Sequence, residues 1–542
     1  MTEQTQEQTK QSWFPLIVIV FSMMMMYTTS FGINVLIAPI VQEFKWNISG
    51  LQLVIVSASL IAGSFQVTAG RLGDKLGKKK IFLWGNIIYT IGIIIVVLAP
   101  NSLIFSLGWA LIWPFGMVLI IPTMIALIMY YYTGEQRAIA FGVYGGVLSI
   151  ISAGSPLLVG LLSNELGWRI GLALSPLFGL FTILLTFKLP ETTKDENIKI
   201  DIPSVFLSVF AFALFLIATT FATQYGWFFE KRAFLIGEFQ LPLAGFSIVP
   251  VLYLISFVLL AIFFQRGKAL SAKGEDPLLD GAIFKIKTFT LGATIQSILY
   301  FLLAAFIFTF SVFVQSAAGF DSFSTALVTL PASAGVGVFA LFTSSLGQKI
   351  APKWIIFFGF ALSILGMYLL MLAVSVTATP LDFVPGMSLF GIGLGLVTAQ
   401  IATVTMSDIK EKDEGSASGL SETMKEIIGQ GFAIAFAGAI LFGAVYSNMV
   451  DSYIKVESVK LSETQQSKII VELEDTFNSI TPVKEKEFIK SLPEKTQNSY
   501  QEIVNSAAEK ALQKTVFILA FFSVLAMILS LFLPNIKLRK GN

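Results

Sequence analysis

Residues 70–80 read GRLGDKLGKKK, and the interpretation of the whole chain starts from this stretch. It separates two long apolar runs in a chain that consists mostly of such runs. One carboxylate, Asp74, stands among the cations Arg71, Lys75, Lys78, Lys79 and Lys80. Basic loops resist translocation, so this cluster is expected on the cytoplasmic side of a membrane. The glycines at 70, 73 and 77 predict a tight turn there.

Composition excludes several classes of protein. Of the 542 residues, 55% are hydrophobic and 13% are charged, which is too apolar for a soluble protein and predicts an all-α polytopic membrane protein. Cysteine and histidine are absent, which excludes disulfides, Cys/His zinc sites and histidine proton relays. We expect no cofactor and no metal. The net charge of +2, without a basic aromatic patch, gives no sign of nucleic-acid binding.

Runs of about 20 apolar residues are long enough to cross a bilayer. Fourteen are expected, at 14–40, 50–70, 81–100, 103–132, 138–162, 170–189, 202–223, 244–265, 288–316, 322–346, 354–374, 381–406, 416–447 and 514–534. The short loops on one side carry only the cations Lys45, Arg169, Lys231 and Arg232. By the positive-inside rule, both termini are therefore expected in the cytoplasm. We expect a multi-pass protein of a bacterial cell membrane.

The stretch at 70–80 resembles the loop between the second and third helices of the major facilitator superfamily. The matching positions are Gly70, Leu72, Asp74, Lys75, Gly77, Lys78 and Lys79. The resemblance implies a major facilitator fold. It also implies a cytoplasmic gate network in which Asp74 meets Arg71 and Arg137 in one of two access states. A basic loop that only fixes orientation is the alternative.

Residues 142–160, GVYGGVLSIISAGSPLLVG, resemble the helix-5 antiporter motif of drug-exporting facilitators. The motif positions are Gly146, Gly154, Pro156 and Gly160, and the match is partial because Ser155 and Val159 replace glycines. Small residues at this spacing predict a close helix crossing, and the proline predicts a bend.

Residues 275–289, EDPLLDGAIFKIKTF, resemble the loop before helix 9 in the fourteen-helix drug:proton antiporters, a group that includes quaternary-ammonium multidrug exporters. This resemblance implies two six-helix bundles, at 14–189 and 288–534, with two inserted helices within the linker 190–287. The tails 1–13 and 535–542 would be cytoplasmic. Residues 448–513 would form an extracellular insertion of two or three amphipathic helices, either passive or acting as a lid or as a contact for an extracellular partner. Within it, Ser462 with Gln465 resembles a capping box, and Thr481-Pro482 predicts the start of a helix.

Charged residues inside membrane spans are rare and mark candidate functional sites. The best candidates are Glu422, Lys425 and Glu426. The two glutamates are four residues apart on one helix face, where like charges favour binding of a proton by one of them. The alternative is a solvated first turn, because the uncharged residues 427–446 could span the bilayer unaided.

Two features of the fourteen-helix exporters are missing. They carry an aspartate in helix 1, near Thr29 here, and an arginine in helix 4, aligned with Ala110. Their absence, with 50 phenylalanines, favours an apolar or amphiphilic substrate. Candidate cavity-lining residues, for which helix packing is the alternative role, are Tyr27, Asn34, Gln66, Trp109, Trp113 and Gln315.

The sequence therefore predicts a secondary transporter that exports small hydrophobic or amphiphilic compounds, driven by protons through Glu422 or Glu426. A transporter of lipids or fatty-acid-like amphiphiles, with weak or no proton coupling, is the second hypothesis. A membrane receptor or scaffold acting through residues 448–513 is the third. Catalysis is not expected. The pair Gly77-Lys78 lacks the preceding glycine of a nucleotide-binding loop, because Leu72 stands there.

Overall fold

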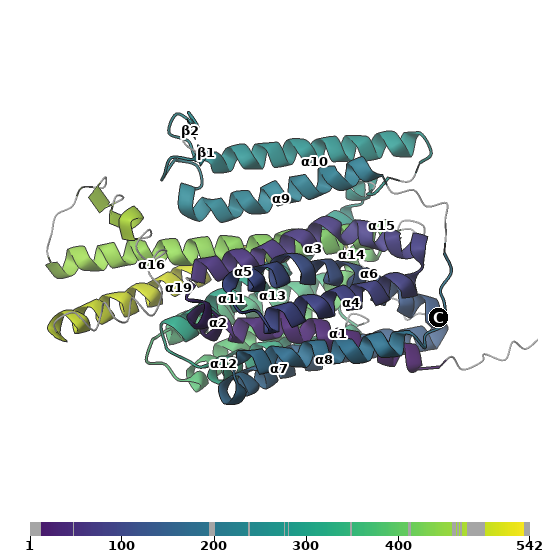
Figure 1. Cartoon of the computed structure of the whole chain (residues 1–542), viewed down its shortest axis with the longest axis horizontal. Helices are drawn as coiled ribbons and strands as arrows, with labels where there is room; N and C mark the ends of the chain where they lie inside the picture. The colour runs from purple at the N-terminus through teal and green to yellow at the C-terminus, as the bar shows by residue number, and fades with distance from the viewer. Residues whose placement is uncertain are drawn as a thin grey trace, which may run out of the picture.

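The computed structural model describes residues 12–46, 48–194, 201–236, 239–275, 277–279, 281–346, 349–409, 414–457, 462, 465–466, 469–473 and 494–535. Long helices running along one axis make up nearly all of this part of the chain (Figure 1). Thirteen of its helices are long and apolar enough to span a membrane, or fourteen when the two parts of a bent helix, Gly50–Gln66 and Thr68–Leu76, count as one span. The polytopic all-α prediction is confirmed.

The helices form two bundles and a separate pair. The first bundle contains α1 (Phe14–Gly32), η1 (Ile33–Val35), α2 (Ile37–Phe44), α3 (Ile48–Leu76), α4 (Lys78–Val97), α5 (Ser102–Ser106), η2 (Leu107–Ile112), α6 (Trp113–Tyr131), α7 (Gly134–Leu166) and α8 (Trp168–Thr186). The second contains α11 (Lys287–Ser316), α12 (Ser322–Leu346), α13 (Pro352–Ala373), η4 (Pro380–Phe383), α14 (Val384–Met406), α15 (Glu414–Met424), η6 (Lys425–Phe432), α16 (Ala433–Glu457) and α19 (Glu494–Leu531).

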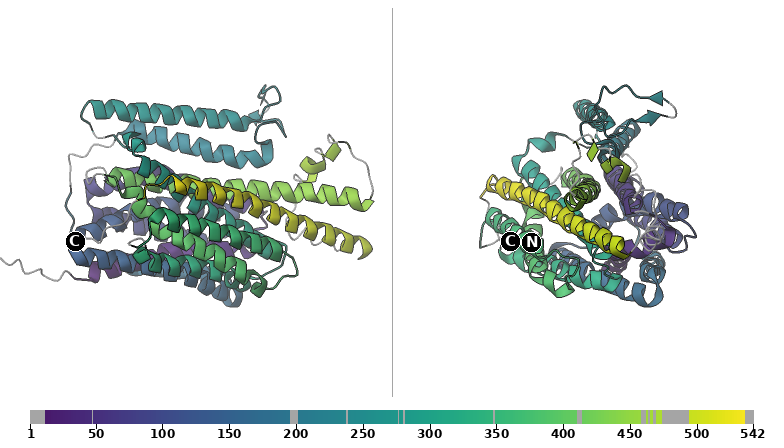
Figure 2. Two further views of the ribbon diagram at one scale, coloured as in Figure 1. Left: turned by 180° about the vertical axis from the view of Figure 1, so that it is seen from behind. Right: turned by 90° about the vertical axis from the view of Figure 1, so that its left-hand side faces the viewer.

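The remaining pair, α9 (Ile202–Tyr225) and α10 (Ile248–Ala272), lies outside both bundles. In Figures 1 and 2 these helices run side by side, and α9 packs on α3 and α16, one from each bundle. A short antiparallel hairpin of β1 (Leu235–Ile236) and β2 (Phe239–Gln240) joins them. We call the end of the molecule with this hairpin the hairpin end, and the opposite end, where α19 finishes, the C-terminal end.

The stretch at 70–80 is more helical than its glycines predict. Helix α3 continues through Gly70 and Gly73 to Leu76, and α4 begins at Lys78. Only Gly77 forms the turn, with a φ of 98° that favours glycine. A Cβ on Gly73 would lie 3.2 Å from Thr123 Cγ2, so this glycine brings α3 close to α6. The prediction of a tight turn therefore holds at one of the three glycines.

The first predicted span, 14–40, is broken. A 3-10 turn at Ile33–Val35 separates α1 from α2, whose first turn contains Pro39. Proline is accepted there because the first turn of a helix leaves its N–H groups without helical partners. The break leaves the Asn34 carbonyl oxygen available, and Gln315 Nε2 donates to it at 2.7 Å.

In the described part of 448–513, residues 465–466 and 469–473 are helical, as expected, and the flanking spans also extend into the segment. Helix α16 continues to Glu457 and α19 begins at Glu494, and both project at the hairpin end (Figure 1). The predicted capping box at Ser462 is present, because its N–H donates to Gln465 Oε1 at 2.9 Å. The predicted helix start at Thr481-Pro482 lies outside the described residues.

Candidate functional site

A π-helical segment, η6, interrupts the helix that carries the charged residues. Such segments hold one extra residue per turn and occur frequently at functional sites. Here the glycines let three neighbouring helices approach. A Cβ on Gly429 would lie 2.8 Å from Tyr300 Cβ on α11, and one on Gly431 would lie 3.0 Å from both Ser59 on α3 and Leu216 on α9.

Glu426 lies at the start of this segment and is 3% exposed. Its Oε1 accepts a hydrogen bond from Gln430 Nε2 at 2.8 Å. Its Cβ faces α3, 3.6 Å from the position that a Cβ on Gly63 would occupy. The carboxylate is thus buried where the two bundles meet.

Glu422 and Lys425 form an ion pair next to Glu426, with 22% and 15% of their side chains exposed. The Lys425 ammonium also lies 5.0 Å from the centre of the Tyr300 ring, within the range of a cation–π contact. One cation is therefore paired with Glu422 and also interacts electrostatically with Glu426, in a partly dehydrated position where charges interact more strongly than in water.

Three tyrosines complete this charged cluster. The hydroxyls of Tyr27 on α1 and Tyr144 on α7 lie 3.3 Å apart. Glu422 interacts electrostatically with both of them and with Tyr300. Both bundles thus contribute to one half-buried group of polar side chains. The sequence analysis named Tyr27 but missed Tyr144, which lies inside the quoted helix-5 stretch, and Tyr300, which no motif marks.

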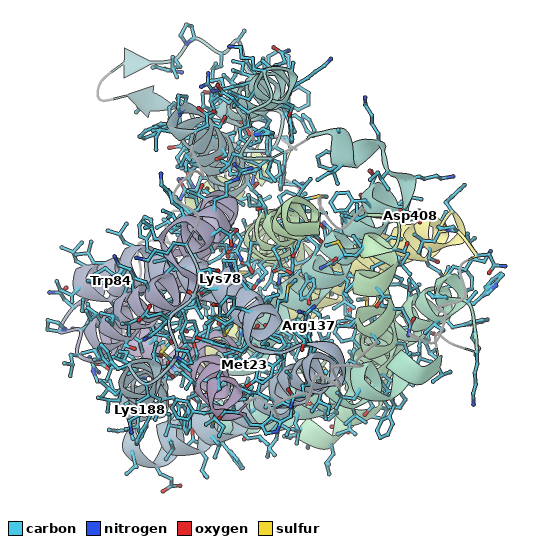
Figure 3. All side chains as sticks on the ribbon, turned by 90° about the vertical axis from the view of Figure 1, so that its right-hand side faces the viewer. Met23, Lys78, Trp84, Arg137, Lys188 and Asp408 are labelled. Atoms are coloured by element: carbon cyan, nitrogen blue, oxygen red, sulfur yellow. The ribbon has the colours of Figure 1, made fainter. Side chains whose placement is uncertain are left out.

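The basic stretch lies at the C-terminal end, onto which Figure 3 looks with Lys78 and Arg137 labelled. Asp74 pairs with Lys78 at 2.9 Å, and Lys79 pairs with Glu191 at 2.8 Å. Arg137 donates to two carbonyl oxygens at the end of α6, those of Met129 and Tyr132. Gly70 and Lys75 lie on the last turns of α3.

Arg71 reaches outside the first bundle. Its guanidinium donates to the carbonyl oxygen of Pro277, in the linker before α11. The gate network of Asp74, Arg71 and Arg137 stays a prediction for another access state. In this structure Lys78 is the ion-pair partner described for Asp74.

The helix-5 glycines have two different environments. A Cβ on Gly146 or Gly154 would meet nothing within 4 Å, whereas one on Gly160 would lie 2.8 Å from the Ser322 carbonyl oxygen of α12. Pro156 lies inside α7, between these two regions. The predicted close crossing is therefore found at Gly160, near the C-terminus of α7, and Gly146 and Gly154, nearer its N-terminus, border open space.

Hydrogen bonds between the bundles gather toward the hairpin end. Asn164 Nδ2 donates to Asp321 Oδ2 at 2.8 Å, and Gln52 Nε2 donates to the Ile434 carbonyl oxygen at 2.8 Å. Gln315 links α11 to the break in helix 1, where its Oε1 also accepts from the Ala38 N–H at 2.9 Å. The two bundles are thus joined at this end.

Of the remaining candidates for cavity lining, the tryptophans pack within the first bundle. Trp109 and Trp113 stack with ring centres 5.0 Å apart and are 2% and 6% exposed. Trp113 also contacts the ring of Tyr89. Gln66 is 2% exposed, and its Oε1 has no hydrogen-bond partner among the described residues.

A second ionic group holds the first bundle together at the hairpin end. Glu43 accepts hydrogen bonds from Arg169 and from the Trp168 indole, and Arg169 donates to the Ala99 carbonyl oxygen at 2.7 Å. Burial acts to raise the pKa of Glu43, but the hydrogen bonds from Arg169 and Trp168 outweigh it and lower this pKa from 4.5.

Comparison with known proteins places this geometry in a family. The family model described as "Major Facilitator Superfamily" matches residues 19–273 and 233–434, which together cover most of the chain. The multidrug resistance protein Stp of Mycobacterium tuberculosis (strain CDC 1551 / Oshkosh) is 24% identical over 79% of this chain and 75% of its own length. The riboflavin transporter RibZ of Clostridioides difficile (strain 630) is 24% identical over 82% and 92%. The quinolone resistance protein NorB of Staphylococcus aureus (strain Newman) is 26% identical over 77% and 85%.

Solved structures share the fold. A bacterial homologue of the human lysosomal transporter Spinster, in an inward-facing and unoccupied conformation, aligns with a TM-score of 0.62 and 14% identity, covering 96% of this chain and 97% of that chain. An auto-inhibited peptide transporter of the POT family aligns with a TM-score of 0.56 and 14% identity, covering 88% and 97%.

Proposed function

The chain belongs to the major facilitator superfamily, and we propose that it exports hydrophobic or amphiphilic compounds in exchange for protons. It is a multi-pass membrane transporter and not an enzyme. The proposal concerns the direction of transport, the coupling ion and the class of substrate.

The observation that carries proton coupling is the buried position of Glu426 on a π-helical segment, beside the Glu422–Lys425 pair. Burying a carboxylate beside a second one favours the protonated form, and a nearby cation favours the ionised form. Because these two effects oppose each other at Glu426, a small change in its surroundings can make the carboxylate bind or release a proton. The tyrosines of the other bundle supply that change, because rocking of the bundles moves Tyr27 and Tyr144 relative to Glu422.

The substrate class follows from the neutral first bundle and from the relatives. Stp and NorB are named for multidrug and quinolone resistance, and RibZ is named as a riboflavin transporter. At the positions that resemble the helix-1 aspartate and helix-4 arginine of the drug:proton antiporters, this chain has Thr29 and Ala110. A substrate recognised mainly by apolar contact is compatible with both observations.

The proposed access state rests on where the described hydrogen bonds between the bundles lie, although α15 also packs on α3 nearer the C-terminal end. With the basic stretch in the cytoplasm, as the positive-inside rule predicts, the hairpin end faces outward. The inter-bundle bonds at Asn164, Gln52 and Gln315 then close the outer side, and the open glycine face of α7 lies on the inner side. Both termini would be cytoplasmic, in a bacterial cell membrane.

The test uses purified full-length protein in liposomes with an imposed proton gradient and an internal pH dye. Lipophilic cations and neutral amphiphiles are added in turn to the wild type, Glu422→Gln and Glu426→Gln. Glu165→Gln is the matched control, because Glu165 is an exposed carboxylate at the hairpin end of α7. We expect proton movement triggered by substrate in the wild type and the control, and its loss in Glu426→Gln.

Transport that continues without proton movement, unchanged in both cluster variants, would refute the antiport proposal. It would instead support the second candidate, a transporter of lipids or fatty-acid-like amphiphiles with weak or no proton coupling. One feature favours that candidate, a groove lined by aromatic side chains beside the π-helical segment.

A further inference from the structure

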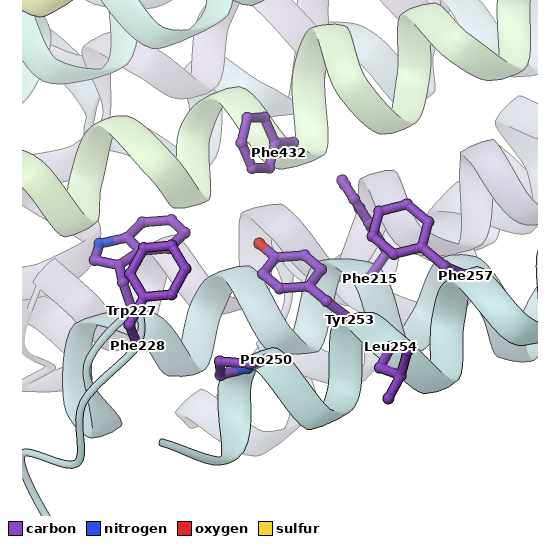
Figure 4. A pocket seen from close by; sticks show the side chains of 8 residues that line it. All are labelled: Phe215, Trp227, Phe228, Pro250, Tyr253, Leu254, Phe257 and Phe432. Atoms are coloured by element: carbon purple, nitrogen blue, oxygen red, sulfur yellow. The ribbon is translucent and has the colours of Figure 1, made fainter. Parts of the chain in front are cut away.

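A groove of about 560 Å³ lies between the separate helix pair and the second bundle (Figure 4). Its walls are lined by Phe215, Trp227, Phe228, Pro250, Tyr253, Leu254, Phe257 and Phe432. The Tyr253 hydroxyl is not free to bind a ligand, because it is hydrogen-bonded to the Thr219 hydroxyl at 2.8 Å. A site of this size holds a small ligand, and these walls recognise it by apolar contact alone.

The groove faces sideways, into the depth that a bilayer would occupy. It lies along the first turns of α10, so it belongs to the membrane leaflet at the hairpin end. The lining residues Leu254 and Phe257, both on α10, are 64% and 56% exposed. On a membrane span, such exposure is exposure to lipid, from which a hydrocarbon chain can enter without crossing water.

The groove and the charged cluster share one structural element. Phe432 is the last residue of the π-helical segment, and Lys425 and Glu426 are its first two. Between them, Gly431 packs against Ser59 of the first bundle and Leu216 of α9. A ligand against Phe432 therefore touches the segment that also carries the buried carboxylate, at the seam between the bundles.

We propose that this groove binds the hydrocarbon chain of a single-chain amphiphile drawn from the leaflet at the hairpin end. The proposal rests on the proposed function, because it names the apolar part of the transported compound. The aromatic side chains of Phe215, Tyr253 and Phe432 give the chain flat contact surfaces, with Phe215 and Phe432 5.6 Å apart between ring centres. The charged or polar head group has no partner within the groove and stays at the membrane surface.

The experiment measures binding without relying on transport. Full-length protein in phospholipid nanodiscs is exposed to a long-chain fatty acid with a diazirine near its methyl end, illuminated, and digested for mass spectrometry. We expect labels on the peptides that carry Phe215, Tyr253–Phe257 and Phe432, and at least fivefold less labelling when unlabelled palmitate is added. The nanodisc phospholipids have two chains and are present in excess, so this competition reports a preference for a single chain.

Two variants locate the site. Leu254→Trp fills the groove and is expected to reduce groove labelling at least fivefold. Phe206→Trp, on an exposed part of α9 outside the groove, is the matched control and is expected to leave the labelling unchanged. Phe257→Ala, which removes a wall, gives a second variant if the first does not fold, and is expected to weaken competition by palmitate.

The outcomes separate the two proposals. Labelling spread over all lipid-facing helices, insensitive to palmitate and to Leu254→Trp, would overturn the groove as a binding site, whatever the transport assay gives. Labelling confined to the groove in a protein that moves no amphiphile in liposomes would support the groove and overturn the proposed function.

Discussion

Replacing Lys425 with glutamine tests whether the charged cluster is one electrostatic unit. The ammonium of Lys425 pairs with Glu422 and also interacts electrostatically with Glu426. Removing it leaves two carboxylates in a partly dehydrated site without a cation. We therefore expect Lys425→Gln to destabilise the folded protein, and the double variant Glu422→Gln/Lys425→Gln to recover part of the loss.

The magnitude follows from the exposure of the pair. Exposed ion pairs contribute about 0–1 kcal/mol, whereas removing one partner of a buried pair costs about 3–5 kcal/mol. With the Lys425 and Glu422 side chains 15% and 22% exposed, the cost should lie toward the buried limit, at about 2–3 kcal/mol. Neutralising both partners leaves no unpaired charge from the pair, so the double variant should regain about 1 kcal/mol or more.

The assay is equilibrium unfolding of the purified protein in mixed micelles, followed for the wild type, both variants and a control. The control is Lys78→Gln, whose partner Asp74 is 51% exposed, so its loss should cost no more than about 1 kcal/mol. If Lys425→Gln costs no more than the control, or if the double variant is no more stable than the single one, the cluster is not an electrostatic unit.

Three further predictions concern other parts of the fold. Glu43→Gln should lower the melting temperature most near neutral pH. The lowered pKa of Glu43 stabilises the folded protein at pH values above 4.5, and this stability disappears as the pH falls through the pKa of the folded state. A pH series of melting curves measures this, and a difference between wild type and variant that stays constant with pH would contradict it. Gly77→Ala should lower the free energy of unfolding by about 1–3 kcal/mol in the same assay, because φ at this position is 98°, which side chains disfavour. An unchanged free energy of unfolding would mean that the turn tolerates a side chain. Arg266→Gln should speed proteolytic cleavage of the chain just after α10, because Arg266 makes two 2.7 Å hydrogen bonds to Asp201 that hold α10 against the start of α9. An unchanged cleavage rate would show that these bonds do not hold the two helices together.

Much of the fold could be predicted because a bilayer imposes a length on every span. Apolar runs therefore gave the spans, and the polar spacing of Ser462 and Gln465 gave a capping box. The helical course of α3 through Gly70 and Gly73 could not be predicted in the same way. Glycine by itself weakens a helix, and the contact of Gly73 with Thr123 appears only after α6 has packed against α3.

The candidate site was predicted in part. Spacing alone placed Glu422 and Glu426 on one face of a regular helix. In the structure α15 ends at Met424 and the π-helical segment begins at Lys425, so the two carboxylates lie on either side of a change in helical repeat. Glu422 keeps Lys425 as its partner, whereas Glu426 accepts from Gln430. A π segment has no local sequence signal here, because it depends on how three helices pack against its glycines.

The first bundle explains why the charged cluster carries so much of the proposed coupling. At the position that resembles the helix-1 aspartate of the drug:proton antiporters, Thr29 is fully buried and donates to Ser175 Oγ at 2.7 Å, and Ser175 donates to the Met25 carbonyl oxygen at 2.8 Å. These neutral hydrogen bonds leave no carboxylate at this position to bind a proton. In the proposed antiport, loss of Glu422 and Glu426 together should therefore abolish coupling rather than reduce it, because the first bundle has no carboxylate at this position to substitute for them.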